Sequence, residues 1–347
     1  MYPKAIFMKK EKKELIIFLA VTYGIPFLMT IPMAILFHAG KDVASFPAAQ
    51  MFYPAAGLML AKLICEKENP FLPKKFFIGF LILTGLMFLW CFTGFFLDEN
   101  IKLYGDDYLP IIGTVVVGFL YFSEGEEKRG AYGLTGKNWR ISVRILILFV
   151  VLTYGSGLLS TFFIEGLPGM GDFLSQVINR DQFLLFVNVP FFVILSMSSF
   201  LGEEYGWRTY FQPLLQKKFG LIKGVLLFGV LWEFWHLPLV FFCYSPADPS
   251  MSLAQMIVFR YIINILMAIF MAYAYMKTQN VWLPVLIHAV NNGLAGGGLA
   301  GGGADVEPVT WMMLGLIVLS RMALFLPFLL AKEFRKPNRE ERAKNDV

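Results

Sequence analysis

Four ionisable side chains stand within or at the end of long apolar stretches: Glu203, Glu204, His236 and His288. An ionisable group at bilayer depth is costly, so such residues are rare and by default mark a functional site with partners. The chain has only three histidines, and two of them lie in these stretches. Carboxylates and imidazoles that meet inside a membrane can activate a water molecule by accepting its proton. The sequence therefore predicts a water-activating site that is sunk in lipid.

The elements that must position these residues are membrane helices. The chain of 347 residues is 57% hydrophobic and 16% charged, with a mean hydropathy of +0.62, whereas soluble domains average about 25% charged residues. Apolar runs of about 20 residues, the length that crosses a bilayer, lie near 15–37, 46–64, 76–97, 108–122, 143–164, 190–216, 219–242, 254–276, 281–299 and 309–331. These runs lack the alternation of barrel strands, and only helices or closed barrels satisfy their backbone in lipid. The predicted fold is all-α, a polytopic membrane helical bundle of about ten transmembrane helices.

The basic residues predict how this bundle is oriented. If ten helices cross the membrane and the N-terminus is inside, 25 of the 30 Lys and Arg residues lie in inner segments. The outer segments hold Lys41, Lys102 and Arg180, and Arg260 and Arg321 lie within apolar runs. Basic residues collect on the cytoplasmic side of membrane proteins, so both termini are expected to be cytoplasmic. The net charge of +5 follows from this topology, and nothing in the sequence resembles a nucleic-acid footprint.

The polar signals are concentrated in one part of the chain. Residues 1–180 are predicted to be scaffold helices, because their apolar runs contain almost no ionisable group. Residues 181–305 carry the candidate site, and 306–347 form a last transmembrane helix and a charged cytoplasmic tail. All three regions are expected to belong to one integral membrane domain. The glycine-rich stretch Gly293–Gly303 is expected to be a flexible outer loop.

Helical spacing separates the roles of the two neighbouring glutamates. Adjacent residues on a helix point about 100° apart, so Glu203 and Glu204 cannot both face one cavity. Glu204 and Arg208 are four residues apart, which is the spacing of an ion pair on one helix face. We therefore expect Arg208 to hold Glu204 as an orienting residue and Glu203 to act as the general base. The reverse assignment of the two glutamates remains open.

Two further stretches supply the imidazoles. His288 and Asn292 are four residues apart and share a helix face, and the amide of Asn292 can hold a polarised carbonyl oxygen beside the imidazole. His236 lies on another helix just before Pro238, and a proline within a spanning helix permits a kink that opens local space.

A third carboxylate, Glu233, lies three residues before His236. It could share the face of that imidazole and accept a hydrogen bond from it. It could instead pair with one of the two intramembrane arginines, Arg260 or Arg321, for purely structural reasons. We expect the pairing with an arginine.

The candidate residues are predicted to lie at a similar depth in the membrane. Measured from the nearest basic residue of the inner interface, Glu203, His236 and His288 stand roughly 21, 20 and 16 Å along their helices at 1.5 Å per residue. For Glu203 this requires a helix that begins near Pro190, because proline is favoured in the first turn. We therefore expect three helices to bring these side chains into one pocket.

The order of the motifs carries a resemblance. Glu-Glu-x-x-x-Arg at Glu203–Arg208, aromatic-x-x-x-His at Trp232–His236 and His-x-x-x-Asn at His288–Asn292 lie on successive predicted helices. In this order they resemble the CPBP family of intramembrane proteases, which includes CAAX-processing enzymes such as the Ras-converting enzyme, and bacteriocin-processing or self-immunity proteins. The resemblance covers residues 190–305.

Longer strings are similar to one bacterial branch of this family, namely Gly202–Arg208 and Trp235–Pro238. Two positions depart from the common family pattern. Trp232 stands where Phe is usual, which keeps an aromatic wall, and Thr209 stands where Gly commonly follows the arginine. Neither departure removes a residue with a catalytic role in the family.

The resemblance implies an intramembrane endopeptidase that cleaves membrane-associated proteins or peptides. Glu203 and His236 would activate a water that attacks a peptide carbonyl, and His288 and Asn292 would stabilise the oxyanion. Glu203, His236 and His288 with an open position also suit Zn²⁺, although the His-Glu-x-x-His helix of familiar zinc proteases is missing from the sequence. Glutamate-type and metal-dependent hydrolysis both remain open, so zinc is a candidate cofactor.

Two rival classes of function also remain open. A non-catalytic immunity protein or membrane receptor would usually have lost a motif residue, and all are present here. A proton-coupled transporter would more often show an internal repeat with matched broken helices, and the sequence shows none. The expected location is the bacterial plasma membrane, and the expected partners are the lipid bilayer and a protein or peptide substrate. The sequence does not predict the substrate, its prenylation or the oligomeric state.

Overall fold

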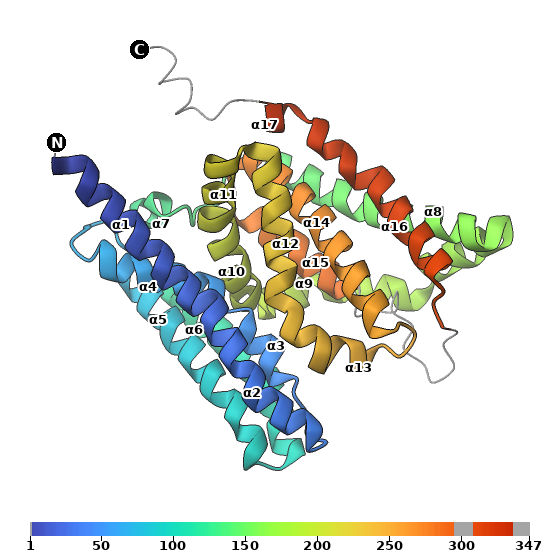
Figure 1. The fold of residues 1–347 in the computed structure, drawn as a ribbon, viewed down its shortest axis with the longest axis horizontal. Helices are drawn as coiled ribbons and strands as arrows, with labels where there is room; N and C mark the ends of the chain where they lie inside the picture. The colour runs from blue at the N-terminus through green and yellow to red at the C-terminus, as the bar shows by residue number, and fades with distance from the viewer. Residues whose placement is uncertain (1, 295–307, 336–347) are drawn as a thin grey trace.

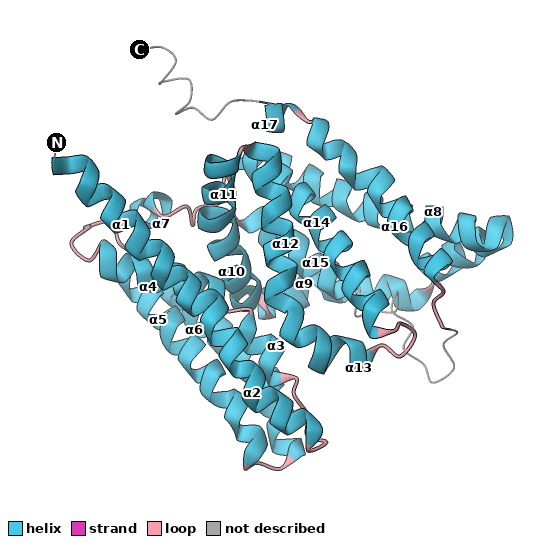
Figure 2. Cartoon of the chain, in the orientation of Figure 1, coloured by secondary structure: helices cyan, strands magenta, loops and turns pink. Residues whose placement is uncertain are grey.

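The computed structural model describes residues 2–294 and 308–335, and every regular element in these two ranges is a helix (Figures 1 and 2). Eight helical segments within them are long and apolar enough to cross a membrane. The predicted all-α, multi-pass membrane bundle is thus confirmed. Most of the glycine-rich stretch predicted to be an outer loop, and the charged tail from residue 336, lie outside the described residues.

The elements follow one another with short connections. The first half of the chain contains α1 (Tyr2–Leu19), η1 (Ala20–Gly24), α2 (Ile25–His38), α3 (Ser45–Gln50), α4 (Tyr53–Cys65), α5 (Lys74–Trp90), η2 (Cys91–Phe95), α6 (Glu99–Ser123), α7 (Glu126–Ala131) and α8 (Trp139–Val177). The second half contains α9 (Arg180–Leu195), α10 (Met197–Gly206), η3 (Trp207–Phe211), α11 (Gln212–Phe219), α12 (Leu221–Leu239), η4 (Val240–Tyr244), α13 (Ser245–Ala247), α14 (Leu253–Thr278), α15 (Trp282–Leu294), α16 (Trp311–Phe325), η6 (Leu326–Leu330) and α17 (Lys332–Arg335). The turns η1, η3 and η4 are π-helical, whereas η2 and η6 are 3₁₀ turns.

Two of the ten expected runs differ from the eight apolar spans. The run 190–216 is divided at Ser196, between α9 and α10, so the helix that carries Glu203 begins at Met197. The expected start near Pro190 is wrong, because Pro190 lies inside α9. The described part of the run 281–299 is α15, which has 13 residues. The helices that differ from ordinary membrane spans are therefore those that carry the glutamate pair and His288.

The long helix α8 is broken within its length. Its 39 residues would extend for about 58 Å as one straight helix, almost twice the hydrocarbon thickness of about 30 Å. Gly166 interrupts it with φ 74° and ψ −158°, a conformation that glycine adopts readily. Pro168 follows and cannot donate a helical hydrogen bond. The chain therefore turns at this point, at the right of Figure 1, and leads back towards α9.

The centre of the bundle is formed by α10, α12, α14 and α15 (Figure 1). The helix α10 packs against α4 and against α15, while α12 packs against α11 and α14, and α14 packs in turn against α16. The helices α1 to α6 lie along one flank, and one apolar core continues from this flank into the central helices. The candidate site therefore lies where the N-terminal helices and the central helices meet.

Ion pairs join segments that the charge pattern predicted to lie on the same side of the membrane. At one end of the bundle, Lys62 contacts Glu14 and Glu66 at 3.0 Å each and so joins α4 to α1. At the other end, Lys102 pairs with Asp42. The first set belongs to the segments expected inside the cell, and the second to the segments expected outside. The two groups of segments therefore lie at opposite ends of the bundle.

Candidate active site

Two glycines flank the glutamate pair and let α10 lie directly against the N-terminal helices. A Cβ atom at Gly202 would meet the carbonyl oxygen of Met51 at 2.7 Å, and one at Gly206 would meet that of Pro54 at 2.2 Å. Small residues four apart permit this close approach between membrane helices. The string Gly-Glu-Glu-Tyr-Gly thus fixes the rotation of α10. It also makes the predicted N-terminal scaffold a wall of the site.

Glu204 faces the dry interior, where both of its carboxylate oxygens accept hydrogen bonds. Arg208 Nε lies 2.6 Å from Glu204 Oε2, and His288 Nδ1 lies 2.8 Å from Glu204 Oε1. The ion pair predicted from the four-residue spacing is therefore confirmed. Glu204 and Arg208 are both 0% exposed, and an ion pair in such a place is stable only if its other hydrogen bonds are also made.

The remaining donors of Arg208 are satisfied by its neighbours. Its Nη1 donates to Gln212 Oε1 at 2.8 Å, and Gln212 donates onwards to Gln216 at 3.3 Å. The guanidinium lies 4.8 Å from the ring centroid of Phe228 and 4.9 Å from that of Trp232, which are favourable cation–π distances. A ladder of buried polar side chains therefore runs from Glu204 through η3 into α11, and it holds the Glu204 carboxylate in place.

Glu203 points to the other side of α10. Its Oε1 accepts a hydrogen bond from Trp232 Nε1 at 2.6 Å and lies 3.8 Å from His236 Nε2. His236 Nδ1 lies 3.0 Å from the backbone oxygen of Trp232. Because a carbonyl oxygen can only accept, Nδ1 carries the proton in this contact and the Nε2 lone pair faces Glu203. Two acceptors at 3.8 Å leave a gap that a bridging water fits.

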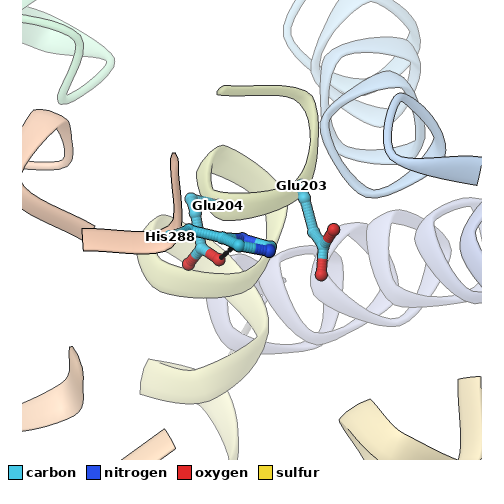
Figure 3. Close-up of side chains that lie close together, drawn as sticks. All are labelled: Glu203, Glu204 and His288. Atoms are coloured by element: carbon cyan, nitrogen blue, oxygen red, sulfur yellow. Dashed lines mark hydrogen bonds and ion pairs between the residues drawn. The ribbon is translucent and has the colours of Figure 1, made fainter. Parts of the chain in front are cut away.

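The ring of His288 lies between the two carboxyl groups (Figure 3). Its Nδ1 contacts Glu204, and the opposite edge of the ring is turned towards Glu203. The rings of Phe200 and Trp232 pack edge-on against it, with centroid distances of 5.2 and 5.9 Å. The orientation of this imidazole is therefore fixed by one hydrogen bond and two aromatic contacts.

Two cavities meet at the histidines. A cavity of about 190 Å³ is lined by Glu203, His236, His288 and Asn292, together with residues of α3. A second cavity of about 530 Å³ shares the two histidines and Asn292, and extends between α12, α14, α15 and α16. Residues from α10, α12 and α15 thus meet in one hollow, and the predicted convergence of three helices is confirmed.

Glu233 pairs with Arg260, as predicted. Arg260 Nε lies 2.8 Å from Glu233 Oε1, and the amide of Asn264 donates to the other carboxylate oxygen. The alternative contact is present as a longer one, because Glu233 Oε2 lies 3.6 Å from His236 Nδ1. A third carboxylate therefore stands directly behind the imidazole that faces Glu203.

Sequence reasoning missed several neighbours of the site. Gln50 in α3 donates to the backbone oxygen of Trp235 at 2.8 Å and lines the smaller cavity. Tyr244 lines both cavities, with Arg260 lying 4.2 Å from its ring centroid. The motif spacing gave no signal for either residue, although a lone glutamine in an apolar run could have marked α3. The hydrogen bond from Trp232 to Glu203 was also missed, since only an aromatic wall was expected there.

The donor atoms can be compared with the needs of a metal ion. The compact set within the described residues is Glu203, Glu204 and His288, whose donor atoms lie within 4.8 Å of one another. The expected set, which has His236 in place of Glu204, is not among the compact groups. Glu204 is a poor metal ligand here, because Arg208 and His288 already occupy both of its oxygens. The atoms left for a metal are those of Glu203, His236 and His288, a set with one open position that suits Zn²⁺.

The segment that carries the site also matches known proteins. Residues 185–294 match the family model of the Type II CAAX prenyl endopeptidase Rce1-like proteins. A curated relative, CAAX prenyl protease 2 of Methanococcus maripaludis, is 43% identical over 56 residues, which is 16% of this chain and 20% of the relative. No solved structure matches the chain. All five predicted site residues, from Glu203 to Asn292, lie within the segment that the family model covers.

Proposed function

We propose that this chain, whose residues 185–294 match the family model of the Type II CAAX prenyl endopeptidase Rce1-like proteins, is an intramembrane endopeptidase. Its substrates would be membrane-associated proteins or peptides. The aligned segment covers only 20% of the curated relative, so the proposed activity rests on the geometry of this chain's own site.

One observation carries the proposal: a carboxylate and an imidazole lone pair face each other across 3.8 Å in a cavity of about 190 Å³. Glu203 and His236 Nε2 are both hydrogen-bond acceptors in this arrangement, so neither can donate a hydrogen bond to the other. A water molecule has two protons and can donate one to each. Held in this way, its oxygen lone pair is free to attack an electrophile.

The reaction would follow from this geometry. As the water oxygen bonds to the peptide carbonyl carbon, Glu203 takes up one of its protons and the carbonyl oxygen becomes an oxyanion. Asn292 would donate a hydrogen bond to that oxyanion, and His288 in its imidazolium form would donate a second one through the Nε2–H that faces away from Glu204. When the C–N bond breaks, the proton held at Glu203 passes to the leaving amine, and atoms and charges balance.

Glu204 and Arg208 would act as positioning residues rather than as reacting groups. Both oxygens of Glu204 are engaged, one of them by the Nδ1 atom of His288 at 2.8 Å. Arg208 fixes Glu204 in turn at 2.6 Å. The buried ladder would thus keep His288 aligned for the oxyanion at no reorganisation cost during the reaction.

The donor types of Glu203, His236 and His288 also suit a metal-dependent version of the same hydrolysis, although the compact donor group contains Glu204 in place of His236. Glu203, His236 and His288 would hold a zinc ion, which supplies a water of lowered pKa when bound. Measurement of bound metal in the purified protein, together with activity before and after chelation, distinguishes the two versions.

The proposal is tested with the full chain purified in detergent. We expect it to cleave members of a synthetic peptide library, and cleavage in H₂¹⁸O to place one ¹⁸O in the new carboxyl group. His236→Ala should abolish cleavage. The matched control is His38→Ala, which changes the third histidine of the chain, at the end of α2 and away from the site, and should leave cleavage unchanged.

Two outcomes would count against the proposal. The first is a folded wild-type protein that cleaves no member of the library, even in liposomes. The second is cleavage that survives His236→Ala undiminished, which would place the chemistry elsewhere. Products without ¹⁸O would exclude direct attack by water.

A further inference from the structure

The larger cavity, of about 530 Å³, holds two positively charged side chains. It begins at His236, His288 and Asn292, and its far side is formed by α14 and α16. Arg260 of α14 and Arg321 of α16 both line it. The mechanism proposed above uses the near side of this cavity and gives no role to the far side.

The two arginines differ in their partners. Arg260 is committed to Glu233 at 2.8 Å and lies 4.2 Å from the ring centroid of Tyr244. The guanidinium carbon of Arg321 lies 5.2 Å from the ring centroid of Phe325. Within residues 2–294 and 308–335, none of the described carboxylates lies within ion-pair distance of it. The cavity wall therefore holds one compensated guanidinium and one without a counter-ion among the described residues.

The depth of Arg321 makes this lack of an anionic partner significant. It is ten residues beyond Trp311, the first residue of α16, and nine before Leu330, the last residue of that span, so it stands about 15 Å from either end. Unpaired charge at this depth is costly, and such residues mark substrate or ion pathways. A guanidinium that lines a cavity can be compensated by an anion that enters the cavity.

The chemistry of the wall indicates what kind of anion would enter. The planar guanidinium binds a carboxylate with two parallel hydrogen bonds. Asn291 and Asn292 line the same cavity, and amides can pair with both the N–H and the C=O groups of a peptide backbone. A peptide that carries a carboxylate therefore matches this wall better than a lipid phosphate, which has no backbone amides.

We propose that Arg321 binds a carboxylate of the peptide substrate and so fixes the substrate relative to the hydrolytic centre. This inference rests on the proposed endopeptidase function. The carboxylate is either the C-terminus of the substrate or an acidic side chain next to the cleaved bond. Arg321 lies outside the matched segment 185–294, so the motifs of the family do not contain it.

The experiment compares charged and neutral versions of one peptide. A peptide that the wild-type protein cleaves is resynthesised with a C-terminal amide, and separately with each acidic side chain changed to its amide. We expect one of these changes to raise KM by about tenfold to a hundredfold, the size expected for a lost charged hydrogen bond, with kcat nearly unchanged. The version that causes the loss identifies which carboxylate is bound.

Variants assign the effect to Arg321. Arg321→Gln should raise KM for the charged peptide by the same factor and leave KM for the neutral peptide unchanged. Arg321→Lys should restore part of the affinity, because it keeps the charge without the planar fork. Arg144→Gln, an equivalent change at an exposed position of α8, is the matched control and should behave like the wild type.

The outcomes separate this inference from the function on which it rests. If the wild-type protein cleaves all peptide versions with one KM, the carboxylate site is disproved while the endopeptidase stands. An equal loss by Arg321→Gln on charged and neutral peptides would mean a structural role, and a KM raised only by anionic phospholipid in the micelles would assign the site to lipid. If Arg321→Gln does not fold, Arg321→Lys makes the same assignment through a KM that rises for the charged peptide and not for the neutral one. Cleavage of no peptide counts against the proposed function itself.

Discussion

The two faces of α10 carry the same residue type in opposite surroundings. On one face, Glu204 accepts from Arg208 and His288, and the ladder continues through Gln212, with all of Glu204, Arg208 and Gln212 fully buried. On the other face, Glu203 accepts from Trp232 and borders a cavity of about 190 Å³. Adjacent positions on a helix point about 100° apart, and this rotation places one carboxylate among buried partners and the other beside a cavity.

The difference matches what the proposed function requires, which is a reactive carboxylate that is held in place within lipid. A buried charge needs a full set of partners, and Glu204 has one. Glu203 has an incomplete set, and a water or a substrate can supply what it lacks. The face with Glu204 holds the face with Glu203 in place, because both belong to one helix. Gly202 and Gly206 let this helix lie directly against the Met51–Phe52 turn and α4.

The largest expected effect is that of Glu203→Gln. The amide keeps the shape of the side chain but cannot accept a proton from water, so we expect kcat to fall by about 10²–10⁴-fold, the usual contribution of general base catalysis. The thermal midpoint in detergent should change little, because this face of α10 borders a cavity. Glu68→Gln, at an exposed glutamate outside the site, is the matched control for both measurements. If Glu203→Gln were inactive because it had unfolded, the two faces of α10 would not differ in the way described.

The next largest effect is expected on the face of α10 that carries Glu204. Arg208→Met leaves the Glu204 carboxylate buried without its cation, which typically costs about 3–5 kcal/mol of stability. Because an apolar replacement of a whole ion pair is far better tolerated, the double variant Glu204→Met, Arg208→Met should be more stable than Arg208→Met alone. The measurement is a double-mutant cycle of unfolding free energies in detergent. Additive losses would show that the pair is not coupled, against the 2.6 Å contact.

Spacing along the sequence predicted well the pairs of residues that lie within one helix. The pair of Glu204 and Arg208, and the shared face of His288 and Asn292, depend only on the helical repeat, and both are present. The similar depth of the three stretches stays a prediction. The pairings that depend on the repeat of a single helix were therefore predicted correctly.

Contacts between helices could not be predicted in this way. The break at Ser196 has no proline or glycine at its position, and Pro190 six residues earlier is accommodated within α9, so no local signal identified the start of α10. The bonds from Trp232 to Glu203 and from Gln50 to the Trp235 backbone join residues 29 and 185 positions apart. Such contacts depend on how helices rotate against one another, which close packing sets and spacing within one helix does not.

A smaller effect is expected for Trp232→Phe, which tests the hydrogen bond that Trp232 donates to Glu203. Phenylalanine keeps an aromatic ring beside Arg208 and removes the Nε1–H that lies 2.6 Å from Glu203. A lost hydrogen bond to a charged group is worth about 1.5–3 kcal/mol. We expect kcat/KM to fall by about tenfold to a hundredfold, since the carboxylate loses the group that aims it. The matched control is Trp139→Phe, at an exposed tryptophan on α8, and activity equal to the wild type would show that the cavity alone positions Glu203.

The smallest effect is expected at Glu66, a carboxylate as well supplied with donors as Glu204 but placed at the aqueous end of the bundle. Burial acts to raise the pKa of Glu66, yet hydrogen bonds from Tyr132, Lys62 and Lys10 outweigh it and lower the pKa to about 2. A lowered folded-state pKa gives stability that is fully present above the unfolded value of about 4.3 and is lost as the pH falls towards 2.

Glu66→Gln should therefore reduce stability at pH 7 by no more than about 1 kcal/mol per ion pair, because water can solvate the charges that remain. It should also flatten the loss of stability between about pH 4.5 and pH 2, measured as thermal midpoints in detergent against pH. Glu68→Gln should keep the wild-type slope. A loss of stability for Glu66→Gln as large as that for Arg208→Met would contradict this expectation. It would mean that the number of hydrogen-bond donors, and not their burial, decides how much a carboxylate contributes to the free energy of unfolding. The contrast between the two faces of α10 would then have no physical basis.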